Sequence, residues 1–191
     1  MVATDPYQVP EPDTARERRY AQTVNELPGR LRIRPTGEGD LADLGRLWND
    51  GEVMRWVGFP EGLGYDQPAM RRWLDATDAD PRRHHFVVHD RELGFCGELF
   101  YVVDPVHRRA ELDVKLAPPA QGHGIATAGL TWLIERIFET EPEVDAVWTE
   151  PWPENRASRA LYERCGLAET VRPADLRPGP SYWERRRSER R

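Results

Sequence analysis

The sequence has few cysteines, a single lysine and no long apolar run. Its two cysteines among 191 residues, Cys96 and Cys165, are too few for a disulfide framework or a cysteine zinc site, so both are interpreted as reduced packing residues. No apolar run approaches the ~20 residues that span a bilayer. The segment from Met1 to Arg19 is polar and lacks the apolar stretch of a signal peptide. These absences predict a cytoplasmic protein with no membrane partner.

The charge balance is acidic. The 33 Asp and Glu residues outnumber the 27 Lys and Arg residues, which gives a net charge of −6. A body that binds nucleic acid usually carries a basic patch, so no nucleic-acid partner is expected. The arginine-rich end, Arg185 to Arg191, is interpreted as a solvated tail. An acidic body is compatible with a cationic amine as substrate.

The chain length suits one domain with short extensions. Residues 1–28 are predicted to form an N-terminal extension, helical from Thr14 to Glu26, and residues 29–191 a single domain with a basic C-terminal tail. Periodicity and capping residues predict further helices over Asp40–Asn49, Asp66–Ala76, Thr127–Phe138 and Asn155–Cys165. Alternation and turn signals predict strands over Leu31–Arg34, His84–His89, Gly94–Val103, Ala110–Ala117, Ala146–Thr149, Ala168–Arg172 and Ser181–Arg186.

The most informative segment is Gln121–Ala126, Gln-Gly-His-Gly-Ile-Ala, between a predicted strand and a predicted helix. Bare backbone N–H groups at a helix N-terminus attract phosphate, and glycine permits close approach. A Walker A loop is excluded because no lysine follows the glycines; the only lysine, Lys115, precedes them. A dinucleotide-binding loop fits poorly because Thr127 stands at its third small position and the segment lies late in the domain.

The same loop resembles the pyrophosphate loop of the GNAT superfamily of acyl-CoA N-acyltransferases, through Gln121, Gly124 and Ala126. The run Ala110–Pro118 resembles the strand that enters this loop in the family. Asn155, Tyr162 and Gly166 resemble the family's later Asn…Tyr…Gly helix. The resemblance extends over roughly Leu31 to Arg172 and is nearest to the branch of ribosomal-protein alanine N-acetyltransferases. It implies an α/β GNAT fold, with a mixed central sheet and helices on both faces.

The resemblance implies acetyl-CoA as co-substrate and a set of residues that hold it. The pantetheine arm is expected along the strand at Val114 and Leu116, one of which donates a backbone N–H to the thioester oxygen. Asn155 is expected to cap its helix and, as in the family, to contact CoA. The remaining residues expected to bind the co-substrate are those of the loop: Gln121, Gly122, His123, Gly124, Ile125 and Ala126.

An alkyl ammonium, with a pKa near ~10, must lose a proton before it attacks a thioester. Period-two alternation places Glu111, Asp113 and Lys115 on one face of their strand. Glu111, at the family's Glu position, is the preferred base, with Asp113 second and Glu150 third; the alternative is a merely solvated or salt-bridged face. Tyr162 matches the family's tyrosine that protonates the leaving thiolate, or else it is a buried packing residue.

The predicted function is acetyl transfer from acetyl-CoA to a primary amine, on a protein N-terminus or a small molecule, in a ternary complex. The segment Glu150-Pro151-Trp152-Pro153, which leads into the predicted helix at Asn155, leaves open an aminoglycoside- or siderophore-type acyltransferase. A non-catalytic CoA-binding regulatory module is the alternative from another class. No metal is expected, because His84, His85 and His89 lack companion ligands at a recognisable spacing. A homodimer is possible.

Overall fold

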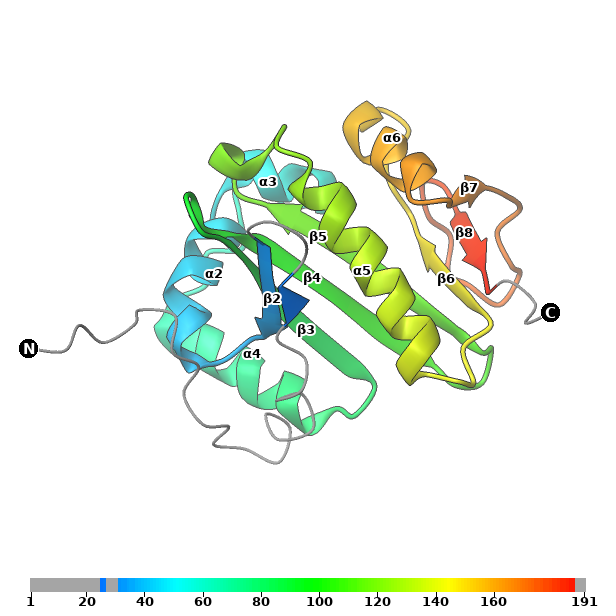
Figure 1. Cartoon of the computed structure of the whole chain (residues 1–191), viewed down its shortest axis with the longest axis horizontal. Coiled ribbons are helices and arrows are strands. Elements are labelled where there is room, and N and C mark those ends of the chain that lie inside the picture. Colours follow the sequence, from blue (N-terminus) through cyan, green and yellow to red (C-terminus); the bar gives the residue numbers. More distant parts are fainter. Residues whose placement is uncertain (1–24, 27–30, 188–191) are drawn as a thin grey trace, which may run out of the picture.

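The computed structural model describes residues 25–26 and 31–187. Their strands form one mixed sheet in the order β1-β2-β3-β4-β5-β6-β8-β7 (Figure 1). Only the β5–β6 pair is parallel; each other neighbouring pair is antiparallel. The strands are β1 (Asn25–Glu26), β2 (Leu31–Pro35), β3 (Arg83–Asp90), β4 (Gly94–Asp104), β5 (Arg109–Leu116), β6 (Ala146–Thr149), β7 (Ala168–Glu169) and β8 (Trp183–Arg186).

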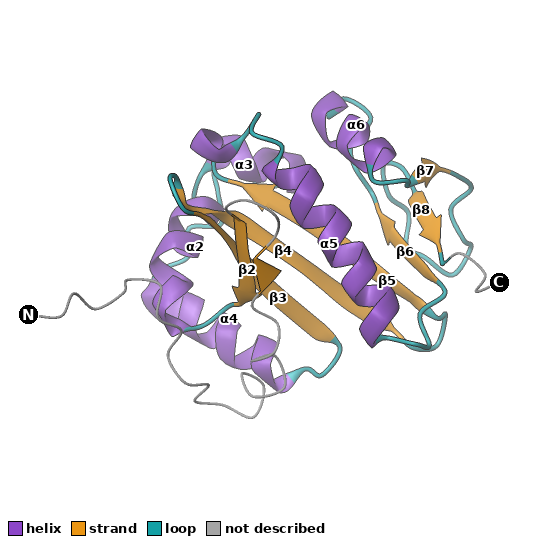
Figure 2. Cartoon of the chain, in the orientation of Figure 1, coloured by secondary structure: helices purple, strands orange, loops and turns teal. Residues whose placement is uncertain are grey.

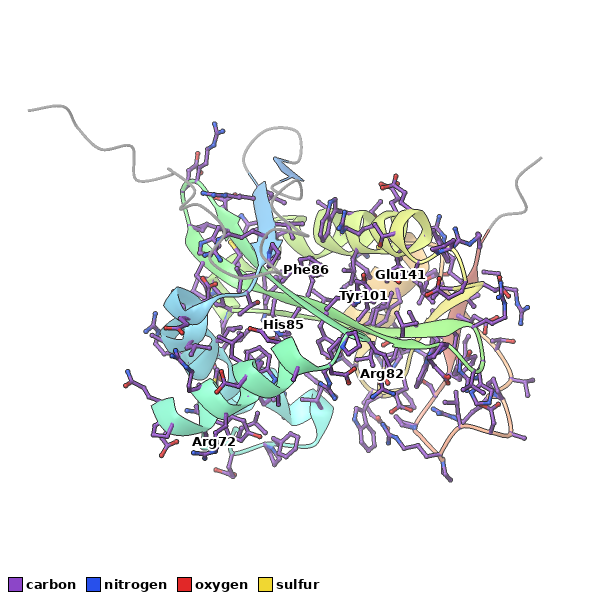
Figure 3. All side chains as sticks on the ribbon, turned by 90° about the horizontal axis from the view of Figure 1, so that it is seen from below. Arg72, Arg82, His85, Phe86, Tyr101 and Glu141 are labelled. Carbon is purple, nitrogen blue, oxygen red and sulfur yellow. The ribbon has the colours of Figure 1, made fainter. Side chains whose placement is uncertain are left out.

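Helices cover both faces of the sheet, as Figures 2 and 3 show. The α-helices are α2 (Leu41–Trp48), α3 (Gly51–Met54), α4 (Gln67–Ala79), α5 (Ile125–Thr140) and α6 (Arg156–Arg164), and the 3-10 turns are η1 (Glu38–Asp40), η2 (Arg55–Val57) and η3 (Pro118–Ala120). Helices α5 and α6 share one hydrophobic core with the sheet, and α2 and α4 form a second core. The predicted α/β fold class is therefore confirmed.

Each core follows from the apolar periodicity of its helix. In α5, residues Leu130, Leu133 and Ile137 are fully buried, as their helical spacing predicts. A Cβ added at Gly129 would lie 3.3 Å from Leu99 Cδ1, so the helix approaches β4 closely there. No helix in the described part of the chain is long and apolar enough to cross a membrane.

The predicted caps Asp66 and Asp40 have different outcomes. Asp66 caps α4 as predicted, because its Oδ1 accepts a hydrogen bond from the Ala69 N–H at 2.8 Å. Asp40 does not cap α2. Its carboxylate instead accepts from the Gly37 N–H at 2.9 Å and from Arg34 at 2.6 Å, so it closes the η1 turn that precedes the helix.

Three predicted boundaries are wrong. Asn25–Glu26 is a strand paired with β2 rather than a helix end; the rest of the predicted Thr14–Glu26 helix lies outside the described residues. No helix is predicted between Asn49 and Asp66, but that segment contains α3 and η2. Strand β7 stops at Glu169, well before Arg172. The Thr170 N–H still bonds to the Tyr182 carbonyl at 2.9 Å. Farther along, Pro173 has no N–H for a ladder, and the Arg172 side chain reaches the Ser181 carbonyl.

Candidate active site

Strands β5 and β6 diverge near the middle of the sheet. They pair only where Arg109 to Glu111 lie beside Ala146 to Trp148. Beyond that point β5 keeps its ladder with β4, and the Ala117 N–H bonds to the Cys96 carbonyl at 2.8 Å. Because N–H groups alternate along an antiparallel pair, those of Val114 and Leu116 point away from β4, toward the opening.

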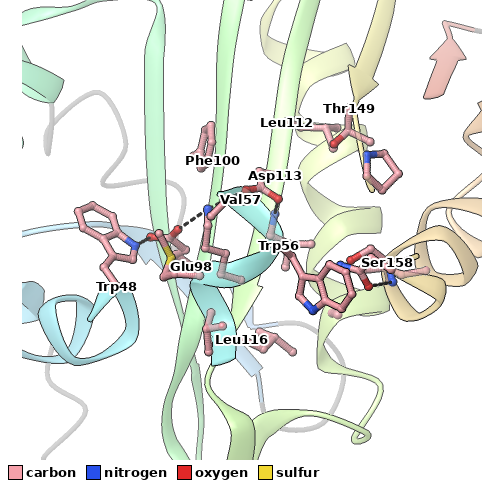
Figure 4. A pocket seen from close by; sticks show the side chains of 18 of the residues that line it. Trp48, Trp56, Val57, Glu98, Phe100, Leu112, Asp113, Leu116, Thr149 and Ser158 are labelled. Carbon is pink, nitrogen blue, oxygen red and sulfur yellow. Dashed lines mark hydrogen bonds and ion pairs between the residues drawn. The ribbon is translucent and has the colours of Figure 1, made fainter. Parts of the chain in front are cut away.

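A cleft of about 1430 Å³ occupies this opening. Its wall includes β5, the start of α5, α6, the α3–η2 segment and the loop after β7. Figure 4 shows one part of it, with Trp56 and Val57 from η2 beside Asp113 of β5. Among the sequence-predicted site residues, the cleft brings together Glu111, Asp113, Val114, Leu116, Gln121, Gly122, Gly124, Ile125, Ala126, Asn155 and Tyr162.

The glycine loop reaches the cleft through a left-handed turn. Gly122 and Gly124 have φ of 80° and 78°, a region that favours glycine. Gly124 precedes the first turn of α5, whose N–H groups stand at the cleft rim. The Gln121 side chain donates to the Leu116 carbonyl at 3.1 Å, which ties the loop to the end of β5. The exposed His123 is absent from the lining, unlike its neighbours in the loop.

Glu111 stands where β5 and β6 part. Its register partners are Val102 of β4 and Trp148 of β6. Within the described residues its carboxylate has no hydrogen bond or salt bridge. Burial raises the pKa of Glu111, and the charges of Glu150 and Asp113 raise it further. A half-buried carboxylate with a raised pKa is suited to taking a proton near neutral pH.

Asp113 lies in a different environment two positions along the same face. Its Oδ2 accepts from Lys115 Nζ at 2.7 Å, and its Oδ1 accepts from the Val114 N–H at 2.8 Å. Tyr162 Oη lies 3.4 Å from the same Oδ1. The carboxylate of Asp113 therefore already has a cation and two hydrogen-bond donors.

A buried polar network continues from Lys115 to α2. Lys115 Nζ donates to Glu98 Oε1 at 3.1 Å, and Trp48 Nε1 donates to Glu98 Oε2 at 2.7 Å. His85 Nε2 lies 2.9 Å from the same oxygen, and His85 Nδ1 lies 2.7 Å from Thr36 Oγ1. Burial alone would raise the pKa of Glu98, but the charges of Lys115 and His85 lower it to about 2. Glu98 is thus a buried anion, with the interactions that such a charge requires.

Tyr162 and Asn155 enter from α6 and the residue before it. Burial, and then the charge of Asp113, raise the pKa of Tyr162 far above the usual range, so its hydroxyl is protonated at neutral pH. The Asn155 side chain accepts from the Ser158 N–H at 3.1 Å, which confirms the predicted cap. A raised pKa also makes the phenol a weaker acid, so the hydroxyl gives up its proton only as that proton is replaced from another donor.

Glu150, the third candidate base, is held by two arginines. Arg172 and Arg177 each bond to it at 2.7 Å, from the segment between β7 and β8. Sequence reasoning found neither of these partners nor Glu98, His85 and Trp48. A lone glutamate in an otherwise apolar strand was the available signal for Glu98, whereas nothing local marks Arg172 or Arg177. In the described ranges, no group of three or more His, Cys, Asp or Glu side chains could hold a metal ion.

Comparison with known proteins defines the class. Residues 30–168 match the acetyltransferase (GNAT) domain family, and the chain belongs to that family. It is 28% identical over 159 residues to the putative ribosomal N-acetyltransferase YdaF of Bacillus subtilis, covering 80% of this chain and 84% of that protein. It is 24% identical over 144 residues to the spermidine N(1)-acetyltransferase of Vibrio cholerae, covering 75% and 82%.

Solved structures agree on the fold. The alpha-N-protein acetyltransferase RimL in complex with coenzyme A superimposes with a TM-score of 0.70 at 16% identity, covering 85% of this chain and 96% of that one. The Vibrio cholerae spermidine N-acetyltransferase in complex with CoA and spermine gives 0.68 at 22% identity, covering 81% and 92%. The predicted recognition as a GNAT acetyltransferase is confirmed: this chain is an acetyl-CoA-dependent N-acetyltransferase, and its relatives include a putative ribosomal N-acetyltransferase.

Proposed function

We propose that the chain acetylates a primary amine in a ternary complex with acetyl-CoA, with Glu111 as the base and Tyr162 as the acid. The observation that supports this best is the contrast among the cleft carboxylates. In the described part of the cleft, Glu111 is free of hydrogen bonds and salt bridges, whereas Asp113, Glu98 and Glu150 are each bonded to a cation. Only Glu111 can accept a proton without first losing a partner.

The free edge of β5 and the loop Gln121–Ala126 are suited to binding acetyl-CoA, the acetyl donor. The N–H groups of Val114 and Leu116 face the opening, where an extended pantetheine arm can pair as an added strand. The Val114 N–H donates to Asp113 Oδ1 at 2.8 Å, so the arm would have to replace that contact to pair there. The turn at Gly122 and Gly124 presents the N-terminus of α5 to a pyrophosphate. One of the two strand N–H groups would stabilise the negative charge that develops on the thioester oxygen, a contact worth about 3 kcal/mol.

The reaction then balances with two side chains. Glu111, directly or through water, takes a proton from the acceptor ammonium, which frees the nitrogen lone pair. The nitrogen attacks the thioester carbon, so a C–N bond forms and the C–S bond breaks. The thiolate that leaves takes the Tyr162 hydroxyl proton, and Asp113 orients that hydroxyl from 3.4 Å. As the amide forms, the second proton of the attacking nitrogen passes through water to the Tyr162 oxygen, and Glu111 releases its own proton to solvent, so both side chains return to their starting states. Asp113 therefore acts as a positioning residue, not as the base.

The acceptor is proposed from the relatives as an amine on a small molecule or at a peptide N-terminus. These relatives include a spermidine N(1)-acetyltransferase and a putative ribosomal N-acetyltransferase; a further neighbour is an aminoglycoside acetyltransferase, at a TM-score of 0.68 and 22% identity. We propose in addition a cytoplasmic location and a homodimer, and light scattering at several protein concentrations tests the dimer.

A thiol-release assay with acetyl-CoA over peptides, polyamines and aminoglycosides, together with calorimetry of acetyl-CoA binding, tests this function. We expect binding and acceptor-dependent release. Tyr162→Phe should lower kcat by about a hundredfold and leave the acetyl-CoA dissociation constant within about twofold. Binding without release from any amine would indicate a CoA-binding module and overturn the proposal. A Tyr162→Phe variant with unchanged kcat would remove the tyrosine from the mechanism.

A further inference from the structure

We propose that the acceptor is a singly charged primary amine with an apolar body, and that polyamines and aminoglycosides are poor acceptors. This inference rests on the proposed function, because it concerns the same cleft and takes Glu111 as the group that meets the ammonium. It concerns charge and hydrophobicity, the two properties that distinguish the acceptors of the relatives from one another.

Among the described residues, the cleft has no second free carboxylate for a second ammonium. Glu150, the acid beyond Glu111 on the β6 side, lies at 2.7 Å from both Arg172 and Arg177. An ammonium that approached Glu150 would have to displace a guanidinium already in place. Exchanging one ion pair for another leaves little net gain, since the incoming cation also loses its hydration.

The other acids of the lining are also neutralised. Lys115 bridges Asp113 and Glu98, and Glu52 lies 3.3 Å from Arg55. The described lining residues with a formal charge are equally divided between five acids and five Lys or Arg residues: Glu52, Glu98, Glu111, Asp113 and Glu150 against Arg55, Arg83, Lys115, Arg164 and Arg177. The cleft therefore has no excess negative charge with which to attract a polycation.

Arginine charges also act on Glu111 itself. The charges of Arg177 and Arg83 both act on the Glu111 carboxylate, and both side chains line the cleft. Arg177 is 71% exposed, so its charge faces any acceptor that enters. A first ammonium paired with Glu111 is tolerated, whereas a second one nearby meets like charge.

The mouth of the cleft offers apolar surface instead. Large hydrophobic side chains are exposed at seven places in the described residues, and four of these line the cleft: Val57, Phe59, Tyr65 and Trp152. Phe59 and Trp152 keep 46% and 44% of their surface exposed. Exposed apolar groups along the same cleft indicate a binding surface. They favour an acceptor that places a hydrophobic group beside its amine.

Initial-rate assays at saturating acetyl-CoA test the inference with four amines. Phenethylamine and a short peptide with a free N-terminus and apolar side chains represent the proposed class; spermidine and ribostamycin represent the polycations. We expect kcat/KM for at least one monoamine to exceed both polycations by tenfold or more, a difference of about 1.4 kcal/mol. The peptide and phenethylamine arms distinguish a protein N-terminus from a small amine.

Two variants examine the causes. Arg177→Gln should raise the ratio of kcat/KM for spermidine to that for phenethylamine about threefold, because it removes exposed positive charge. Trp152→Ala should lower kcat/KM for the monoamine at least fivefold and leave the acetyl-CoA KM unchanged, because it removes apolar surface. Val171→Ala, at an 88% exposed side chain outside the cleft, is the matched control and should change neither value.

Each outcome has one meaning. Turnover of spermidine or ribostamycin at least equal to that of both monoamines overturns the acceptor inference and leaves the proposed function standing. An unchanged ratio of spermidine to phenethylamine in Arg177→Gln overturns the electrostatic argument in the same way. Acetyl-CoA binding without thiol release from any amine overturns the proposed function, and the inference with it.

Discussion

The two ends of the charged face of β5 differ in their surroundings, although the same alternation created both. At one end Glu111 lies where β5 and β6 separate, and its carboxylate has no hydrogen bond or salt bridge among the described residues. At the other end Lys115 is buried between Asp113 and Glu98, over the ring of Phe100. Sequence alternation assigns these residues to one face, but neighbouring strands and helices decide which charge is open to a substrate. The open end suits proton transfer and the closed end suits positioning.

The sharpest test of the contrast is removal of the Glu111 charge. Glu111→Gln keeps the shape of the side chain but cannot take a proton, so kcat/KM should fall about 10³-fold in the thiol-release assay. The acetyl-CoA dissociation constant should stay within about twofold. Glu150→Gln is the matched control, because Glu150 is already paired with Arg172 and Arg177. We expect a loss below tenfold there, and an equal loss in both variants would contradict the assignment.

Removing the buried ion pair between Lys115 and Glu98 should reduce the stability of the fold. Lys115→Met leaves the buried Glu98 without its cation, so the free energy of unfolding should fall by about 3 kcal/mol in urea titrations. In the double variant Lys115→Met/Glu98→Gln the uncompensated charge is gone, and most of the loss should be recovered. Purely additive losses in the double variant would show that the two side chains do not interact.

The buried carboxylate of Glu98 predicts how the free energy of unfolding depends on pH. The pKa of Glu98 is about 2 in the folded protein, against an ordinary value of 4.5. Its contribution is therefore fully present above pH 4.5 and is lost as the pH falls from 4.5 toward 2, because the unfolded chain takes up the proton first. Urea titrations across this range should show a shallower acid-side decline for Glu98→Gln than for the unaltered chain. Identical slopes would mean that Glu98 is not the anion described.

The smallest expected effect concerns the donor end of the cleft. Gly124→Ala places a side chain at a φ of 78°, so unfolding free energy should drop by about 1 kcal/mol. Nothing lies within 4 Å of a Cβ at this position, so the cost comes from the backbone and not from a clash. Gly39→Ala is the matched control, since Gly39 has equal space and no positive φ. Thermal unfolding of both variants makes the comparison, and equal melting temperatures would refute the backbone argument.

Most of the fold could be predicted because its signals are local. The strands from His84 to Ala117 and the helix after Gln121 follow alternation and helical periodicity, and their observed bounds differ from the predicted ones by only a few residues. The errors occurred where a remote partner intervened. The Asp40 carboxylate bonds to Arg34 and to the Gly37 N–H instead of to the helix it was predicted to cap. The strand predicted to reach Arg172 ends early, and the Arg172 side chain bonds to Ser181 and Glu150.

By itself, the sequence determined the donor half of this protein: the loop Gln121–Ala126, the strand that enters it and the capped helix at Asn155. A glycine turn and an alternating strand are properties of consecutive residues, so they can be recognised without coordinates. Tertiary structure alone decided the acceptor half. Arg177 neutralises Glu150, and Lys115 joins Asp113 to Glu98 of another strand. Whether a carboxylate is free depends on charges that are close in space but distant along the chain, and folding brings those together.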